Sequence, residues 1–252
     1  MPFRRTRDLI AELSPTGLGS QLGMWLCADR IGAADGASIS AWGDSSGNGN
    51  NASAAGANQP TAKLGVNGVN GQPAANFSAA GTDYMTLVDG ATIHPATLTL
   101  GAMFRQNGSA QYCHLFSRWY SASWSAPYVS YSLVLNDDLA HTPEFDVTIA
   151  GTRKPCLATG YTYPSGLVML IGVYDGVTQN LYGNGKLIKS LAQTGAVDYT
   201  YATTNNYLGQ ASGGYYVNLD LAECFIASAI TERQRRGIEL RWARQYGVQL
   251  AA

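Results

Sequence analysis

Short apolar runs recur along the chain from Leu22 onward, and Gly, Asn, Asp or Pro separates most of them. Short runs of apolar and aromatic residues bounded by turn residues are typical of β-strands. Many such strands at close spacing predict an all-β protein, an antiparallel jelly-roll sandwich. The predicted strands are LGMWLCA (22–28), PAANF (73–77), YMTLV (84–88), LTLGAMF (98–104), HLFSRWY (114–120), YVSYSLVL (128–135), FDVTIA (145–150), LVMLIGVY (167–174), NLYGNG (180–185), NNYLGQ (205–210) and YYVNLDLAECFIA (215–227).

One strong helical pattern follows near the C-terminus. Thr231 is a suitable N-cap, and Gly247 can end the helix in the left-handed conformation. Ile238, Trp242 and Tyr246 recur at helical spacing between these two residues. The pattern therefore predicts a C-terminal helix with one face that packs on the sandwich.

Residues 1–20 differ from the rest of the chain, because apolar and basic residues are mixed there and SPTGLGS follows as a helix breaker. This mixture predicts a short amphipathic helix. We expect an N-terminal arm over residues 1–20 and one domain over residues 21–252. The arm is either a frayed terminus or an assembly anchor. The anchor residues would be Phe3, Arg4, Arg5, Arg7, Ile10 and Leu13.

Composition excludes several classes of function. Only 13% of the 252 residues are charged and the net charge is -1, so no bulk charge favours nucleic acid or an anionic membrane as a partner. No apolar run approaches the roughly 18 residues of a membrane span, and the N-terminal residues lack the apolar core of a signal peptide. The four cysteines have no zinc-site spacing, and Cys27 and Cys224 are expected in the core as reduced thiols.

Several stretches resemble one family. The opening stretches are MWLCAD (24–29), ISAWGDSSGNGNNA (39–52), NQPT (58–61), VNGQPAANF (69–77) and TDYMTL (82–87), and the closing ones are VYDGVTQNLYGNGKLI (173–188) and LDLAECFIASAITERQRRGIELRWARQYGV (219–248). Together they resemble the laminin-G-like, concanavalin-A-like jelly-roll modules of bacterial and phage proteins. The resemblance implies a concanavalin-A-like fold over residues 22–248. That fold hosts lectins, glycoside hydrolases and interaction modules, so it does not decide the function.

Aromatic residues concentrate in SRWYSASWSAPYVSY (117–131) and again in GQASGGYYVN (209–218). Aromatic faces stack on sugar rings and also supply the contact area of protein interfaces. Ordinary core packing is the third interpretation. The candidate residues for binding a carbohydrate or a protein partner are Trp119, Tyr120, Trp124, Tyr128 and Tyr215.

The run around Asp44 raises the question of a metal. Carboxylate and carbonyl oxygens are the donors that Ca²⁺ prefers, but this run supplies a single carboxylate. Gly47, Asn48 and Gly49 suit a tight turn. The sequence therefore favours a structural turn with no metal and no cofactor, and calcium remains the alternative.

A paired-carboxylate motif is also present. Glu144 and Asp146 alternate on a predicted strand, so they share one face, and the pattern resembles that of family-16 glucanases. The acid/base position of that pattern falls on Thr148 or Ile149, so the resemblance supplies a nucleophile without a proton donor. The alternative is an exposed strand face with two solvated acids. We expect no enzymatic activity.

These observations, with the resemblance, lead to one leading hypothesis and two alternatives. The leading one is a non-enzymatic phage virion protein, of head-decoration or tail-fibre type, that displays a lectin-like module. Such a protein would be assembled in the host cytoplasm, contact other virion proteins and copies of itself, and bind a cell-surface glycan. The alternatives are a carbohydrate-binding lectin-like module and a divergent glycoside hydrolase that uses Glu144 and Asp146.

Overall fold

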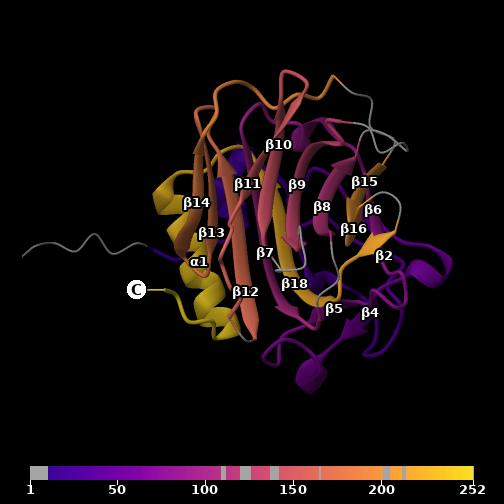
Figure 1. The fold of residues 1–252 in the computed structure, drawn as a ribbon. Helices are drawn as coiled ribbons and strands as arrows, with labels where there is room; N and C mark the ends of the chain where they lie inside the picture. The colour runs from indigo at the N-terminus through magenta and orange to yellow at the C-terminus, as the bar shows by residue number, and fades with distance from the viewer. Residues whose placement is uncertain are drawn as a thin grey trace, which may run out of the picture.

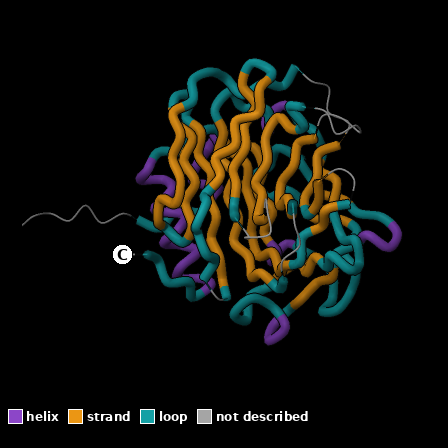
Figure 2. Tube along the Cα trace, viewed as in Figure 1, coloured by secondary structure: helices purple, strands orange, loops and turns teal. Residues whose placement is uncertain are grey.

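The computed structural model of the chain describes residues 11–108, 112–119, 126–136, 142–164, 166–200, 205–211 and 214–251. Two large antiparallel sheets face each other, and one long helix lies at one side of them (Figures 1 and 2). The predicted antiparallel sandwich with a C-terminal helix is confirmed. Five short 3₁₀ helices lie in its connections: η1 (Pro15–Gln21), η2 (Ala28–Arg30), η3 (Gly56–Asn58), η4 (Gly65–Asn67) and η5 (Ala91–Ile93).

The first sheet lies against the long helix. Its strands follow the order β14-β13-β12-β7-β18-β5-β4, and β1 pairs with the second half of β18. Their bounds are β1 (Leu22–Cys27), β4 (Thr61–Lys63), β5 (Ala74–Phe77), β7 (Leu98–Gln106), β12 (Leu167–Tyr174), β13 (Thr178–Gly183), β14 (Lys186–Ala192) and β18 (Leu219–Ala227).

The second sheet has the order β11-β10-β9-β8-β15-β6-β3-β2, and a small sheet of β16 and β17 follows β15. Their bounds are β2 (Ala41–Trp42), β3 (Ala52–Ser53), β6 (Met85–Leu87), β8 (Cys113–Trp119), β9 (Val129–Asn136), β10 (Glu144–Ile149), β11 (Thr152–Leu157), β15 (Asn205–Leu208), β16 (Gln210–Ala211) and β17 (Tyr215–Tyr216). Alternate side chains of both sheets fill the space between them, including Trp42, Phe77, Phe104, Phe116 and Phe145, all fully buried.

The C-terminal helix, α1 (Glu232–Tyr246), has the predicted bounds. The Thr231 side chain accepts a hydrogen bond from the backbone of Gln234, whose side chain accepts one from the Thr231 backbone. This reciprocal pair is a capping box. Gly247 ends the helix at φ 71°, and the predicted face packs on the first sheet, with Trp242 fully buried.

Two arginines of α1 depart from the solvated face that is usual for such residues. Arg235 is buried between Glu232 and Glu239, and its guanidinium lies 3.7 Å from the centre of the Tyr182 ring. Arg241 binds the buried Glu223 of β18 with two hydrogen bonds of 2.9 and 2.8 Å. The Arg241–Glu223 ion pair and the contact of Arg235 with the Tyr182 ring therefore hold the helix to the sheet together with the apolar contacts.

The N-terminal arm meets the domain before residue 20. Residues 11–14 form no helix, and the backbone of Leu13 donates to Gly237 in α1 at 2.9 Å. A β-carbon at Gly237 would lie 2.8 Å from the Ala11 carbonyl, so glycine allows this close approach. Leu18 of η1 is buried against the same side of the sheet. The other predicted anchor residues lie outside the described residues: Phe3, Arg4, Arg5, Arg7 and Ile10.

Candidate functional site

One row of residues crosses all eight strands of the second sheet on the face that points away from the core. Strand registers place its members side by side. Their sequence neighbours Phe116, Tyr131 and Phe145 belong to the core, so the row faces outward. This cross-sheet row consists, from β2 to β11, of Ala41, Ser53, Thr86, Tyr207, Ser117, Ser132, Asp146 and Pro155.

Tyrosines gather where the row passes β6 and β15. The rings of Tyr84 and Tyr207 meet edge to face with centres 5.5 Å apart, and Tyr216 lies 6.2 Å from Tyr84. All three are partly exposed. Tyr215, next along β17, meets Tyr112 at 5.3 Å, and Tyr112 is 41% exposed. Because consecutive residues of a strand point to opposite faces, Tyr112 and Tyr215 form a separate pair. Tyr84, Tyr207 and Tyr216 form one partly exposed aromatic surface, called here the tyrosine surface.

The predicted aromatic site is brought together in part. Trp119, Tyr128 and Tyr215 belong to one cluster with Val129 and Ala211, although Tyr215 is far from the others in sequence. Trp119 is 3% exposed and its ring centre lies 6.1 Å from that of Tyr128, so it is a buried member of this cluster and offers no face to a ligand. Tyr120 and Trp124 lie outside the described residues.

The acidic end of the row is a buried polar cluster. Glu144 and Asp146 share the outward face of β10, as the alternation predicts, and each is at most 1% exposed. Arg153 of the neighbouring β11 binds both carboxylates, at 2.9 Å for Asp146 Oδ2. Ser132 Oγ donates to the same oxygen at 2.6 Å. The expected pair of solvated acids is therefore wrong, because Arg153 and Ser132 compensate the burial of these groups.

The electrostatics of this pair do not fit a glycosidase. Burial alone would raise the pKa of Asp146, but a hydrogen bond from the Glu144 carboxyl and the charge of Arg153 outweigh it and lower that pKa. Catalytic carboxyls of retaining and inverting glycosidases stand about 5 Å or more apart, to leave room for the sugar or a water. Glu144 and Asp146 instead share the guanidinium of Arg153, which favours a structural pair.

His114 lies beside this cluster with its ring centre 6.0 Å from that of Trp119. It is 7% exposed, and among the described residues its Nδ1 atom has no hydrogen-bond partner. Burial lowers the pKa of His114 to about 4, with Asp146 opposing this shift and Arg153 adding to it. The imidazole is therefore neutral at physiological pH.

This histidine should make the free energy of unfolding depend on pH. An unfolded histidine titrates near pH 6.5, so between about 6.5 and 4 the unfolded chain binds more protons than the folded one, and acid favours unfolding. We expect a loss of about 2 kcal/mol between pH 7 and pH 5. Urea unfolding at both pH values measures it, and H114Q should remove most of the loss. An equal loss in H114Q would assign it to other groups.

The loop after β2 is organised by Asp44. Its Oδ1 accepts from the backbones of Trp25 and Ser46 at 2.9 and 2.8 Å, and its Oδ2 accepts from the Ser46 hydroxyl and the Asn50 backbone at 2.7 and 2.9 Å. Asn48 and Asn50 donate in turn to the Gly23 carbonyl of β1. Four protein donors surround the carboxylate, so Asp44 serves the structural turn that the sequence favours.

Three further observations concern metal ligands, membrane-spanning helices and cysteines. In the part of the chain that the structure describes, no three His, Cys, Asp or Glu side chains could hold a metal ion together. The described residues also include no helix with the length and apolar character of a bilayer span. All four cysteines are free and buried, as expected for Cys27 and Cys224. The absence of a metal and a cofactor stays a prediction of the sequence, with calcium as its alternative.

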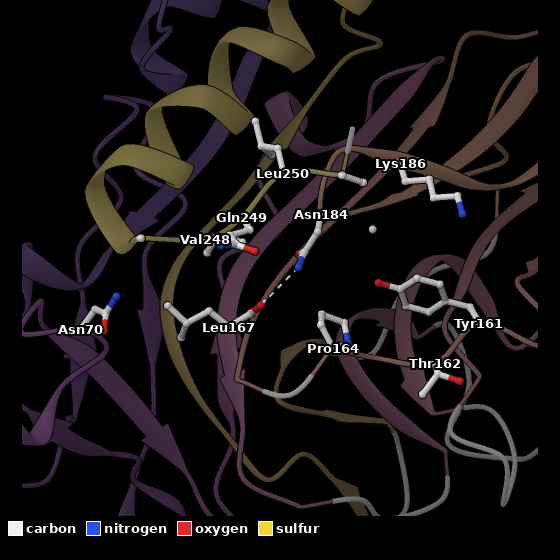
Figure 3. A pocket seen from close by; sticks show the side chains of 13 residues that line it. Asn70, Tyr161, Thr162, Pro164, Leu167, Asn184, Lys186, Val248, Gln249 and Leu250 are labelled. Carbon is white, nitrogen blue, oxygen red and sulfur yellow. Dashed lines mark hydrogen bonds between the residues drawn. The ribbon is translucent and has the colours of Figure 1, made fainter.

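A groove of about 700 Å³ lies elsewhere, between the C-terminal residues and the β13–β14 turn (Figure 3). Tyr161 and Lys186 lie on one side of it and Asn70 on the other (Figure 3). Between them, Asn184 Oδ1 accepts from the Met169 backbone at 2.7 Å and its Nδ2 donates to Leu167. Because the amide of Asn184 is occupied within the protein, the groove offers a ligand less than the tyrosine surface does.

Comparison with known proteins shows that solved structures share this fold. The sequence matches no family model and no curated protein. Among solved structures, the chain is similar to domain 4 of a GH43 extracellular arabinanase from Geobacillus stearothermophilus, which was solved in complex with arabinotriose. The TM-score is 0.61 at 15% identity, over 87% of this chain and 98% of that domain. The likeness shows the fold.

Two further structures share this fold. The binding domain of Paraclostridial Mosquitocidal Protein 1 has a TM-score of 0.60 at 10% identity and covers 92% of this chain. A Trypanosoma rangeli sialidase has a TM-score of 0.55 at 14% identity and covers 90%. This chain spans 53% of the toxin domain and 33% of the sialidase. Both likenesses therefore show the fold alone.

Proposed function

We propose that the protein is a carbohydrate-binding module that holds its ligand against the tyrosine surface. The observation that carries this function is the group of three partly exposed tyrosines, Tyr84, Tyr207 and Tyr216, whose rings contact one another beside the outward face of the second sheet. Each ring offers an apolar face and a hydroxyl, which suits a ligand that has CH faces and many hydroxyls. Among the described residues, none forms a hydrogen bond with the hydroxyls of Tyr84, Tyr207 or Tyr216.

Two observations support a carbohydrate over a protein partner. The row beside the tyrosines presents the exposed hydroxyls of Ser53 and Thr86. Tyrosine rings alone would suit a protein interface equally well, so it is these hydroxyls that favour a carbohydrate. A domain of the same fold, in the arabinanase structure, was solved with arabinotriose.

Glycan binding is tested with a glycan array, followed by titration calorimetry of the hits. We expect binding to a defined class of oligosaccharide, equally with calcium and with EDTA. A blank array under both conditions would overturn the proposal. Sedimentation of the purified chain at increasing concentration tests the protein-interface alternative, since self-association through the tyrosines would appear as a growing mass.

The virion role is the finer part of the hypothesis and stays a prediction. It rests on the family resemblance and on the N-terminal arm, of which residues 11–18 pack on the domain. Co-sedimentation of the native chain with large particles at fixed stoichiometry would support it. A chain found only as a small free species would contradict it and leave glycan binding untouched.

A further inference from the structure

The accessible half of the cross-sheet row carries no charge. It lies over β2, β3, β6 and β15, whose described residues include no Asp, Glu, Lys or Arg. The row residues here are Ala41, Ser53 and Thr86, all exposed, and the partly exposed Tyr207. A ligand on the tyrosine surface therefore meets rings, hydroxyls and backbone.

The charged groups that the structure describes near this half add no free cation. Asp83 and Asp89 flank β6, and both are acids. Arg118 is 3% exposed and binds Asp89 Oδ2 at 3.0 Å, so its charge is already paired. Farther along the row, Arg153 is shared by two carboxylates. The surroundings are neutral to acidic.

A carboxylate is costly to desolvate unless a cation or several donors replace its water. We infer that the tyrosine surface selects neutral glycans and rejects glycans that carry carboxylates, such as sialylated or uronic-acid chains. The inference rests on the proposed function and names its ligand class. A neutral glycan loses only hydroxyl hydration on this surface, and tyrosine and threonine hydroxyls can replace that hydration.

The test uses pairs of oligosaccharides that differ only in carboxylate charge: trigalacturonic acid with its methyl ester, and 3′-sialyllactose with lactose. An array of such pairs, with titration of every bound pair, measures the preference. We expect the neutral member to bind at least about tenfold more tightly wherever a pair binds. Tighter binding of the acidic members would overturn the selectivity and leave the proposed function standing. Binding of no neutral or acidic glycan on the whole array would overturn both.

A charge-gain variant sharpens this test. Thr86 is exposed and lies opposite Tyr207 in the register, so lysine there places a cation beside the tyrosines without disturbing the core. We expect T86K to raise the affinity for acidic glycans about fivefold in low salt, the effect of one exposed ion pair. The gain should disappear in high salt. T86Q is the matched neutral control: it loses the same threonine hydroxyl but adds no charge, so it should not raise the affinity for acidic glycans. An equal gain in T86Q, or none in T86K, would count against charge as the basis of selection.

Discussion

The double variant Y84A/Y207A is expected to lose about 100-fold in glycan affinity. These two rings meet edge to face at the centre of the tyrosine surface, and Tyr207 belongs to the cross-sheet row. Truncating an aromatic anchor at the centre of a binding surface typically costs about 2 kcal/mol or more. Because the rings contact each other, their effects will not add fully, so about 3 kcal/mol is expected for the pair. Calorimetric titration of the best array ligand measures the loss.

Two controls separate binding from folding. Y161A removes a partly exposed tyrosine from the groove in Figure 3, away from this surface, and should leave affinity unchanged. Y207F keeps the ring and loses only the hydroxyl, so it should retain most of the affinity if stacking dominates. Unfolding in urea shows whether each variant is folded. Full affinity in folded Y84A/Y207A would move the binding site elsewhere.

The tyrosine surface shows where sequence analysis succeeds and where it stops. Strand β15, which contains Tyr207, and strand β6, which begins directly after Tyr84, are both predicted from their apolar runs, and alternation places Met85 and Leu87 in the core. Their pairing joins segments about 120 residues apart, and no local pattern records such a partner. The segment around residue 120 is richer in aromatic residues, so the sequence analysis places most of the predicted binding site there instead.

The prediction that Glu144 and Asp146 are solvated is wrong for a related reason. That Glu144 and Asp146 share a face follows from period two along the strand. Their burial depends on Arg153 in β11, a strand whose sequence TRKPCL has no apolar run. β11 is an edge strand, and so is β14, also missed as a separate strand. Edge strands are less buried and carry polar residues, so the apolar periodicity that marks central strands is weak in them.

The largest effect on stability is expected at Glu223. Its carboxylate, fully buried in β18, accepts hydrogen bonds from Trp25 Nε1 at 3.0 Å, from Arg241 at 2.9 and 2.8 Å, and from the Tyr246 hydroxyl at 2.7 Å. E223A would leave the Arg241 guanidinium beneath α1 without its counter-charge. Removing one partner of a buried ion pair costs about 3–5 kcal/mol. For a chain of this size that corresponds to a fall of about 10 °C in Tm, which calorimetry measures.

Glu12 provides the matched exposed ion pair, with Arg244 at 3.1 Å. E12A should change stability by less than about 1 kcal/mol, since exposed pairs contribute little. An E223A effect no larger than that of E12A would mean that apolar packing alone holds the helix. The double variant E223L/R241M then distinguishes two causes of a large loss of stability in E223A. If it recovers most of the lost stability, the cost in E223A came from the unpaired guanidinium, as is usual for buried pairs replaced by apolar groups. If it does not, the remaining cost comes from the hydrogen bonds that this carboxylate accepts: the one from Tyr246 joins α1 to β18, and the one from Trp25 joins β1 to β18.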